Sequence, residues 1–396
     1  MRWVPLALLP FAVVTCTGDD ASNGGTTGDA GADTATDGTT GGDGTTPTPD
    51  SGGGVDASSD ATGDAGATDS AVDGGRDSGV DACSCAATAP STAKCVANGC
   101  LVWLAGGASA NTFTGLAVDA TNVYWTERNN AGQVAAVPVG GGSTRPLAQG
   151  LSFPTNLAVT AAGAFYSGGP VGGTAGFVAK VALAGGTPVA LASGLVTADG
   201  VAADGTSVYF TDYTAGTVAK VSLGSGTIMS LATAQSFPDA IAVDSTNAYW
   251  VNVASGTSAD GSVMKVPLGG GTAVPLATGQ VHPRAIVSDG TNVYWIDEGT
   301  TTTNGAVMKI AIGGGSPVAL ASTQNNPVHI ATDGINVYWT TFEGGVSGHL
   351  FKVPVGGGAP IPMAASSSSA YGQVAVDATS VYWIDDIGAV MKLTPK

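Results

Sequence analysis

Thr291-Asn292-Val293-Tyr294-Trp295-Ile296-Asp297 is the stretch that decides the fold, because altered copies of it recur along most of the chain. Successive copies lie 40 to 45 residues apart, and their aligned aromatic residues are Tyr124, Phe165, Tyr209, Tyr249, Tyr294, Tyr338 and Tyr382. A period of this length is typical of a four-stranded unit of a radial repeat protein. The sequence therefore predicts an all-β, seven-bladed β-propeller.

The fifth copy shows how one blade is built. Ala285–Asp289 and Asn292–Ile296 are short, apolar and rich in β-branched residues, as are Ala306–Ile312 and Pro317–Ala321. The turn Gly313-Gly314-Gly315 separates the last two segments. Short strands divided by Gly, Asn and Asp turns at this spacing predict a four-stranded antiparallel sheet. No segment of the repeat region has the three-to-four-residue periodicity of a helix.

The last repeat is one strand short. After Tyr382 the chain runs through Ala389–Leu393 and ends, which leaves room for three strands. Leu101–Ala105, ahead of the first repeat, resembles Pro317–Ala321 in composition and in its distance to the next blade. We therefore expect strand 101–105 to complete the last blade, which covers the open sheet edges and closes the ring.

Two charged residues recur with the repeat and are expected to be structural. An aspartate stands five residues before the aromatic in six copies, where a short carboxylate accepts backbone N–H groups of a tight turn. A lysine recurs in the third strand, and we expect its stem to pack on the sheet with the ammonium in water. These residues are Asp119, Asp204, Asp244, Asp289, Asp333 and Asp377, and Lys180, Lys220, Lys265, Lys309, Lys352 and Lys392.

The first 16 residues have the pattern of an export signal. Arg2 precedes an apolar run from Trp3 to Val14 that is too short to span a bilayer. Cys16 directly follows this run and opens a polar tract, which resembles the lipobox of bacterial lipoproteins. We expect Cys16 to carry a lipid and the protein to be an outer-membrane or cell-surface lipoprotein. The alternative is a cleaved, secreted protein, and both place the chain outside the cytoplasm.

Residues 17–82 form a linker of Gly, Asp, Thr, Ser and Ala with 14 Asp and a single base, Arg76. Such a composition buries too little apolar surface to offset the entropy of ordering, so we expect a disordered tether. A calcium-binding Asp array is the alternative, but the Asp spacing is irregular. The tether holds most of the formal net charge of −17. Because the chain has no cluster of Lys and Arg, we expect no nucleic-acid partner.

Four cysteines follow within residues 83–100, namely Cys83, Cys85, Cys95 and Cys100. In an exported protein this grouping predicts two disulfides. Two pairings stay open: 83–95 with 85–100, or 83–100 with 85–95. A zinc site is a weaker alternative, because the spacing lacks paired Cys-x2-Cys ligands. The expected domains are thus the signal 1–16, the linker 17–82, the cysteine segment 83–100 and the propeller 101–396.

Several copies of the repeat carry a family resemblance. Tyr124-Trp125-Thr126-Glu127, Tyr209-Phe210-Thr211-Asp212 and Tyr294-Trp295-Ile296-Asp297 resemble the Tyr-Trp-Thr-Asp repeats of low-density-lipoprotein-receptor-type propellers. That resemblance implies extracellular six-bladed rings that bind protein ligands, whereas this sequence has seven copies. Val266–Gly271 is similar to turns of uncharacterised exported bacterial lipoproteins. The fold carries over better than the function, because propellers serve many unrelated functions.

Residues that depart from the repeat gather on one predicted face, formed by the loops before the first strands and the loops between the second and third strands. Polar residues in such loops are candidates for recognition or catalysis. Asp199, Asp239 and Arg284 share the channel-mouth position of neighbouring blades. The binding-face candidates are Asp199, Asp239, His282, Arg284, Glu298, His329, Glu343 and His349.

We interpret the chain as an extracellular binding or scaffolding module that recognises protein or glycan through this face. It is expected to be a monomer without a cofactor that meets membrane only through its lipid anchor. The alternative is a metal-assisted lyase or hydrolase, since the repeats are also similar to those of virginiamycin B lyase. That resemblance implies roles for His282, His329 and Glu298, although no catalytic residue is assigned and whether metal is bound stays open. The sequence shows no nucleophile–base spacing, metal signature or phosphate loop, which favours the binding module.

Overall fold

The computed structural model describes residues 94–96, 99–106, 113–169, 175–254, 259–342, 348–365, 372–385 and 388–396. The chain divides into two compact units, Met1–Asp81 and Ala82–Lys396, and all described residues belong to the second. The predicted signal, Cys16, the tether, Cys83 and Cys85 lie outside the described residues. In the part of the chain that is described, no helix is long and apolar enough to cross a membrane.

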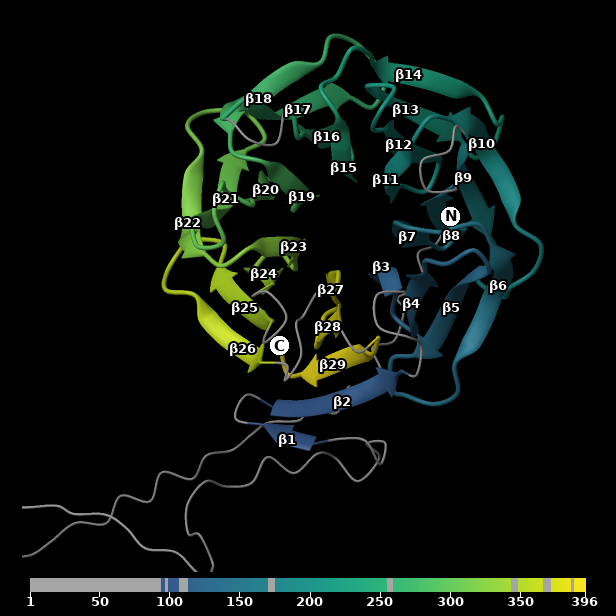
Figure 1. The fold of residues 1–396 in the computed structure, drawn as a ribbon, viewed down its shortest axis with the longest axis horizontal. Helices are drawn as coiled ribbons and strands as arrows, with labels where there is room; N and C mark the ends of the chain where they lie inside the picture. The colour runs from purple at the N-terminus through teal and green to yellow at the C-terminus, as the bar shows by residue number, and fades with distance from the viewer. Residues whose placement is uncertain are drawn as a thin grey trace, which may run out of the picture. The chain divides into compact units, whose positions relative to one another are not determined.

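Seven antiparallel sheets stand around a central axis, as Figure 1 shows, so the predicted seven-bladed propeller is confirmed. Each blade runs outward from an inner strand that faces this axis. Blade one is β3(Phe113–Val118), β4(Asn122–Glu127), β5(Gly132–Pro138) and β6(Arg145–Leu151); blade two is β7(Leu157–Thr160), β8(Gly163–Gly168), β9(Gly176–Val181) and β10(Val189–Leu195); blade three is β11(Ala198–Ala203), β12(Ser207–Asp212), β13(Thr217–Ser222) and β14(Ile228–Ala232). Blade four is β15(Pro238–Val243), β16(Asn247–Asn252), β17(Gly261–Pro267) and β18(Val274–Gln280); blade five is β19(Pro283–Ser288), β20(Asn292–Asp297), β21(Gly305–Ala311) and β22(Val318–Gln324). Blade six is β23(Pro327–Thr332), β24(Asn336–Thr341), β25(His349–Pro354) and β26(Ile361–Ala365), and blade seven is β27(Val374–Val376), β28(Val381–Ile384) and β29(Val390–Thr394) with the N-terminal strands.

The N-terminal strand closes the ring as predicted. Strand β2(Gly99–Ala105) pairs antiparallel with β29, with Val102 opposite Lys392. Val102 and Leu104 are buried in the core between the last and first blades. A further strand, β1(Lys94–Val96), pairs with β2, so this sheet has five strands where four were expected. The pairing of the cysteines stays a prediction.

The repeated Tyr-Trp strand forms the core between blades. Tyr294 and Trp295 are adjacent in β20, so their side chains point to opposite faces of the sheet and pack into different clusters. Both are fully buried, and the equivalent aromatic side chains of the other blades are buried in the same way. Burial of large aromatic side chains on both faces gives each blade a hydrophobic contact with each neighbour.

The recurring aspartates are structural, as predicted, and their contacts explain why tyrosine accompanies them. Asp289 accepts the backbone N–H groups of Thr291 and Asn292 with one oxygen and the Tyr294 hydroxyl with the other, at 2.7 Å. These bonds hold the pKa of the Asp289 carboxyl below its usual value, against the effect of burial. Blade two lacks both partners, because it has Thr160 and Phe165 at these positions.

The recurring lysines do more than we expected. Their ammonium groups were predicted to lie in water, but four of them donate to a backbone carbonyl of the next blade. Lys309 Nζ lies 2.7 Å from the Val355 oxygen, and Lys220, Lys265 and Lys392 bond to Leu268, Ile312 and Val139. A lysine stem is long enough to span the gap between blades, so its ammonium group reaches a backbone carbonyl of the next blade and donates a hydrogen bond to it. In blade one Ala136 replaces the lysine, and Arg145 on the adjacent strand donates to Leu183 instead.

Candidate functional site: the channel mouth

A cavity of about 850 Å³ lies along the central axis. The inner strands of the blades line it with a ring of apolar side chains, including Leu116, Ile241 and Ile286. Near the start of each inner strand stands a residue nine or ten positions before the blade aromatic. Six blades place a polar side chain there: Asn156, Asp199, Asp239, Arg284, His329 and Gln373.

The first blade differs from the others. Its equivalent residue is Thr114, whose hydroxyl bonds to Thr126 and to the Pro154 and Thr155 carbonyls of the second blade. Thr114 is therefore committed to contact between blades. The channel polar ring, as we call the other six side chains, is the part of this layer that a ligand can reach.

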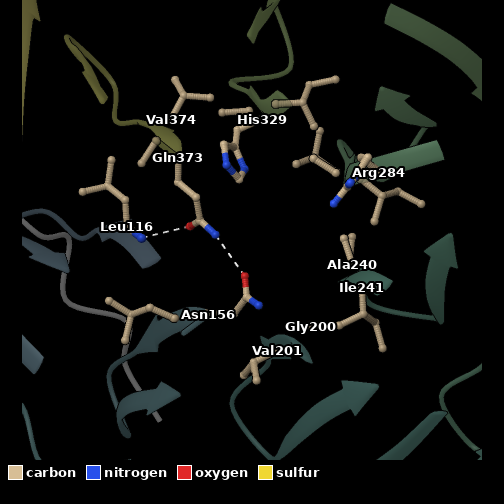
Figure 2. Close-up of a pocket in the computed structure, with 18 of the residues that line it drawn as sticks. Leu116, Asn156, Gly200, Val201, Ala240, Ile241, Arg284, His329, Gln373 and Val374 are labelled. Carbon is tan, nitrogen blue, oxygen red and sulfur yellow. Dashed lines mark hydrogen bonds between the residues drawn. The ribbon is translucent and has the colours of Figure 1, made fainter. Parts of the chain in front are cut away.

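A chain of hydrogen bonds runs through the channel polar ring. Gln373 accepts from the Leu116 backbone N–H at 2.9 Å and donates to the Asn156 side-chain oxygen at 3.0 Å, as Figure 2 shows. Asn156 donates in turn to Asp199 Oδ1 at 2.8 Å. The chain thus links blades one, seven, two and three across the channel, and it fixes which way each amide points.

Asp199 and Asp239 form a carboxyl pair at the end of this chain. Their side chains are hydrogen-bonded to each other, which requires one of the two groups to hold a proton. Burial and the negative charge of Asp199 together raise the pKa of Asp239 to about 8. Because Asn156 donates to Asp199, the negative charge belongs on Asp199 and the proton on Asp239.

Arg284, Glu298 and His282 form a second cluster on the rim. Glu298 Oε2 lies 2.9 Å from Arg284 Nε and 2.9 Å from His282 Nδ1. Burial lowers the pKa of His282, the Glu298 carboxylate opposes this, and the Arg284 charge adds to it. The cluster therefore holds a neutral histidine and an oriented guanidinium group whose side chain is 46% exposed.

His329 projects from β23 toward the channel axis near Gln373, as Figure 2 shows. Among the described residues, none forms a hydrogen bond with its ring nitrogens. Burial and the positive charge of Arg284 together lower the pKa of His329 to about 4. His329 is therefore a neutral imidazole at physiological pH, with one donor and one acceptor nitrogen.

Backbone strain marks the loops of this face. Phe153, Phe237, His282 and Asn326 each precede a proline, yet each has a positive φ, between 36° and 56°. A residue before proline prefers extended backbone, so these conformations cost energy, on the order of 1–3 kcal/mol each. Backbone bonds to the loop after the second strand hold them in place, as where Glu298 N–H donates to the His282 carbonyl. The four lie in blades two, four, five and six.

The structure brings together six of the eight residues that the sequence singled out: Asp199, Asp239, His282, Arg284, Glu298 and His329. His349 begins β25, packs on Phe351 with ring centroids 5.7 Å apart, and does not line the channel cavity. Glu343 lies outside the described residues. The backbone bulge that sets the side-chain direction in β11, β15 and β19 is not visible in the sequence.

Sequence reasoning missed Asn156, Gln373 and Arg128, which also line the cavity. Asn156 and Gln373 stand nine residues before their blade aromatic, as His329 does. That shared position could have identified them. In the part of the chain that the structure describes, no three His, Cys, Asp or Glu side chains form a group able to hold a metal ion.

No protein-family model and no curated protein sequence matches this chain. Its fold is similar to that of a streptogramin B lyase, with 14% identity over 75% of this chain and 97% of that chain and a TM-score of 0.60. Virginiamycin B lyase from Staphylococcus aureus gives 12% identity, coverage of 74% and 98%, and a TM-score of 0.57. The computationally designed Ika8 protein gives 14% identity, coverage of 74% and 98%, and a TM-score of 0.51. These likenesses concern the fold alone.

Proposed function

We propose that this protein is an extracellular binding module that takes a glycan or protein ligand at the channel mouth. The observation that supports this most is the channel polar ring, in which six blades turn polar side chains of five residue types into one open cavity. Structural residues of this propeller repeat from blade to blade, whereas these do not. A rigid ring that holds varied polar groups at one level is suited to recognition.

The proposed location follows from the N-terminal sequence. An apolar run that ends at Cys16, followed by an acidic linker, fits a lipid-anchored protein whose propeller stands away from the membrane. Labelling cells with a radioactive or clickable fatty acid tests this. Label in the wild type and none in a Cys16→Ala variant supports the anchor, and unlabelled wild-type protein contradicts it.

The binding proposal is tested with a variant in which His282, Arg284, Glu298 and His329 are all alanine. This variant keeps the net charge at neutral pH, because it removes one arginine and one glutamate. Its control replaces Ser143, Ser225, Thr227 and Thr272, exposed residues in turns between third and fourth strands. These turns lie at the opposite ends of the strands from the channel mouth. Ligand capture from a glycan array and from a native surface extract is expected to disappear only in the first variant, with similar melting temperatures for both.

The second candidate is a metal-assisted lyase or hydrolase on the same face. The His282–Glu298 pair favours it, because a neutral histidine oriented by a carboxylate is an arrangement used in general base catalysis. Elemental analysis of the purified protein separates the two candidates. Stoichiometric divalent metal that is lost on His282→Ala favours the enzyme, whereas a metal-free protein that binds its ligand favours the binding module.

A further inference from the structure

Two arginines face the channel cavity with unused hydrogen-bond donors. Glu298 holds Arg284 by Nε alone, and no described residue accepts from its terminal Nη atoms, which Figure 2 shows directed into the channel. Arg128, which also lines the cavity, is exposed and forms no hydrogen bond or ion pair with a described residue. The planar end of a guanidinium group matches the two oxygens of a carboxylate.

Six other cations of the described chain are engaged elsewhere. Lys220, Lys265, Lys309 and Lys392 bond to carbonyls of neighbouring blades, Arg145 does the same, and Lys396 pairs with Asp333 at 2.7 Å. The two arginines at the mouth therefore stand out, because the fold does not use their terminal donors. Their positive charges also reach the interior: burial raises the pKa of Asp199, and the charges of Arg284 and Arg128 both oppose that rise.

An aromatic pair stands next to these charges. Tyr213 and Phe237 lie with ring centroids 5.2 Å apart, and Phe237 is 44% exposed although it is a large apolar side chain. Burial raises the pKa of Tyr213, and Arg284 is close enough for its positive charge to oppose that rise. Phe237 has a strained backbone, with a φ of 56°, and directly precedes the inner strand β15 of blade four. An exposed aromatic face beside a charged guanidinium group is suited to the C–H face of a sugar ring.

The channel polar ring supplies partners for hydroxyl groups. Neutral His329 can donate and accept, charged Asp199 accepts, and Asp239, whose proton is bonded to Asp199, can still accept. Hydroxyl groups both donate and accept, so a polyhydroxylated ring can satisfy such a mixed set in several orientations. An extended peptide offers its donors and acceptors along a line and matches a compact ring less well.

We propose that the ligand at the channel mouth is a carboxylated sugar, a uronic acid at the end of or within a glycan, with its carboxylate on Arg284 and its ring on the Tyr213–Phe237 pair. This inference rests on the proposed binding function and narrows its ligand class. The ligand carboxylate accepts hydrogen bonds from the free Nη donors of Arg284, while Arg284 Nε keeps its bond to Glu298. The hydroxyl groups point toward Asp199, Asp239 and His329.

The test is isothermal titration of the full chain with galacturonate and glucuronate oligosaccharides of two to four units. Their methyl esters and matched neutral hexose oligosaccharides are the comparison ligands. The acids are expected to bind at least about tenfold more tightly than the esters, because a charge-assisted pair is lost in the ester. Arg284→Gln is expected to remove that preference, and Phe237→Ala to weaken acid and ester alike.

Arg145→Gln is the matched control, because it removes the same charge from an outer strand far from the mouth. Equal binding of acid and ester, equal loss in Arg284→Gln and Arg145→Gln, or no binding of any uronate would overturn the inference. Arg284-dependent binding of short peptides through a free carboxyl end, without uronate binding, also overturns it. The wider proposal fails separately, if native ligand is still captured by the variant with alanine at His282, Arg284, Glu298 and His329.

Discussion

At the residue scale, the proton shared between Asp199 and Asp239 is the most unusual feature of the channel. The sequence indicated both residues, since they break the repeat at a shared position next to the predicted channel. It did not indicate that they touch, because their side chains come from different blades and meet through the closure of the ring. Nor did it indicate Asn156, whose bond to Asp199 fixes where the charge lies.

This pair predicts a specific pH dependence of stability. Folding raises the pKa of Asp239 from an ordinary 3.8 to about 8. As pH rises through this window the unfolded chain releases the proton while the folded protein keeps it, so this residue lowers the free energy of unfolding progressively. In an Asp239→Asn variant the introduced amide donates to Asp199 in place of the protonated carboxyl group. The loss of unfolding free energy with rising pH is then absent.

We expect Asp239→Asn to be more stable than the wild type at pH 8, by about 2 kcal/mol after allowance for water in the channel, and nearly equal to it at pH 4. Urea unfolding at pH 4, 6 and 8 measures the difference. If the difference in unfolding free energy between variant and wild type stays constant from pH 4 to pH 8, the two carboxyl groups do not share a proton.

At the element scale, the blades owe their recognisable sequence to contacts that repeat. The Asp289–Tyr294 turn and the buried Trp295 could be predicted, because each recurs at a fixed place in the repeat. The role of the lysines could not, since a carbonyl of the next blade, about 46 residues away for Lys309, leaves no local pattern. Another bond between blades runs from the Thr211 hydroxyl to the Asp239 carbonyl at 2.7 Å. It is absent where Val251 or Ile296 replaces the hydroxyl residue.

The lysine contacts predict unequal effects of one substitution. Lys309→Met keeps an apolar stem but leaves the Val355 carbonyl without its donor, so we expect a loss of about 1–2 kcal/mol in unfolding free energy. Lys180→Met is the matched control. Lys180 lies over the Phe165 ring at 5.9 Å and bonds to no carbonyl among the described residues, so we expect a smaller loss. Equal losses of unfolding free energy in the two variants, measured by chemical denaturation, would contradict this prediction.

At the scale of the whole molecule, closure was predictable because the strand count was one short at the C-terminus and one in excess before the first repeat. Strand β1 could not be predicted, because the short segment Lys94–Val96 has no counterpart in the other blades. The channel follows from closure: its cavity has a complete wall only when β27, β3 and the five inner strands between them stand in one ring.

Removal of the closing strand tests this. A chain that begins at Ala82 keeps the four cysteines and β2, and we expect it to unfold cooperatively at the temperature of the longer protein. A chain that begins at Gly107 exposes β29 and the core around Val390. It is expected to melt at least about 10 °C lower or to aggregate through its open edge. Equal melting temperatures for the two chains would show that β2 does not close the ring.

The central claim is that function lies in the residues that break the repeat at the channel mouth. Ligand binding by the variant with alanine at His282, Arg284, Glu298 and His329 tests it most directly, measured beside the variant altered at Ser143, Ser225, Thr227 and Thr272. With both variants folded to the same melting temperature, the account predicts that the mouth variant loses capture of its glycan or protein ligand and that the control retains it. Undiminished capture by the mouth variant would contradict the account.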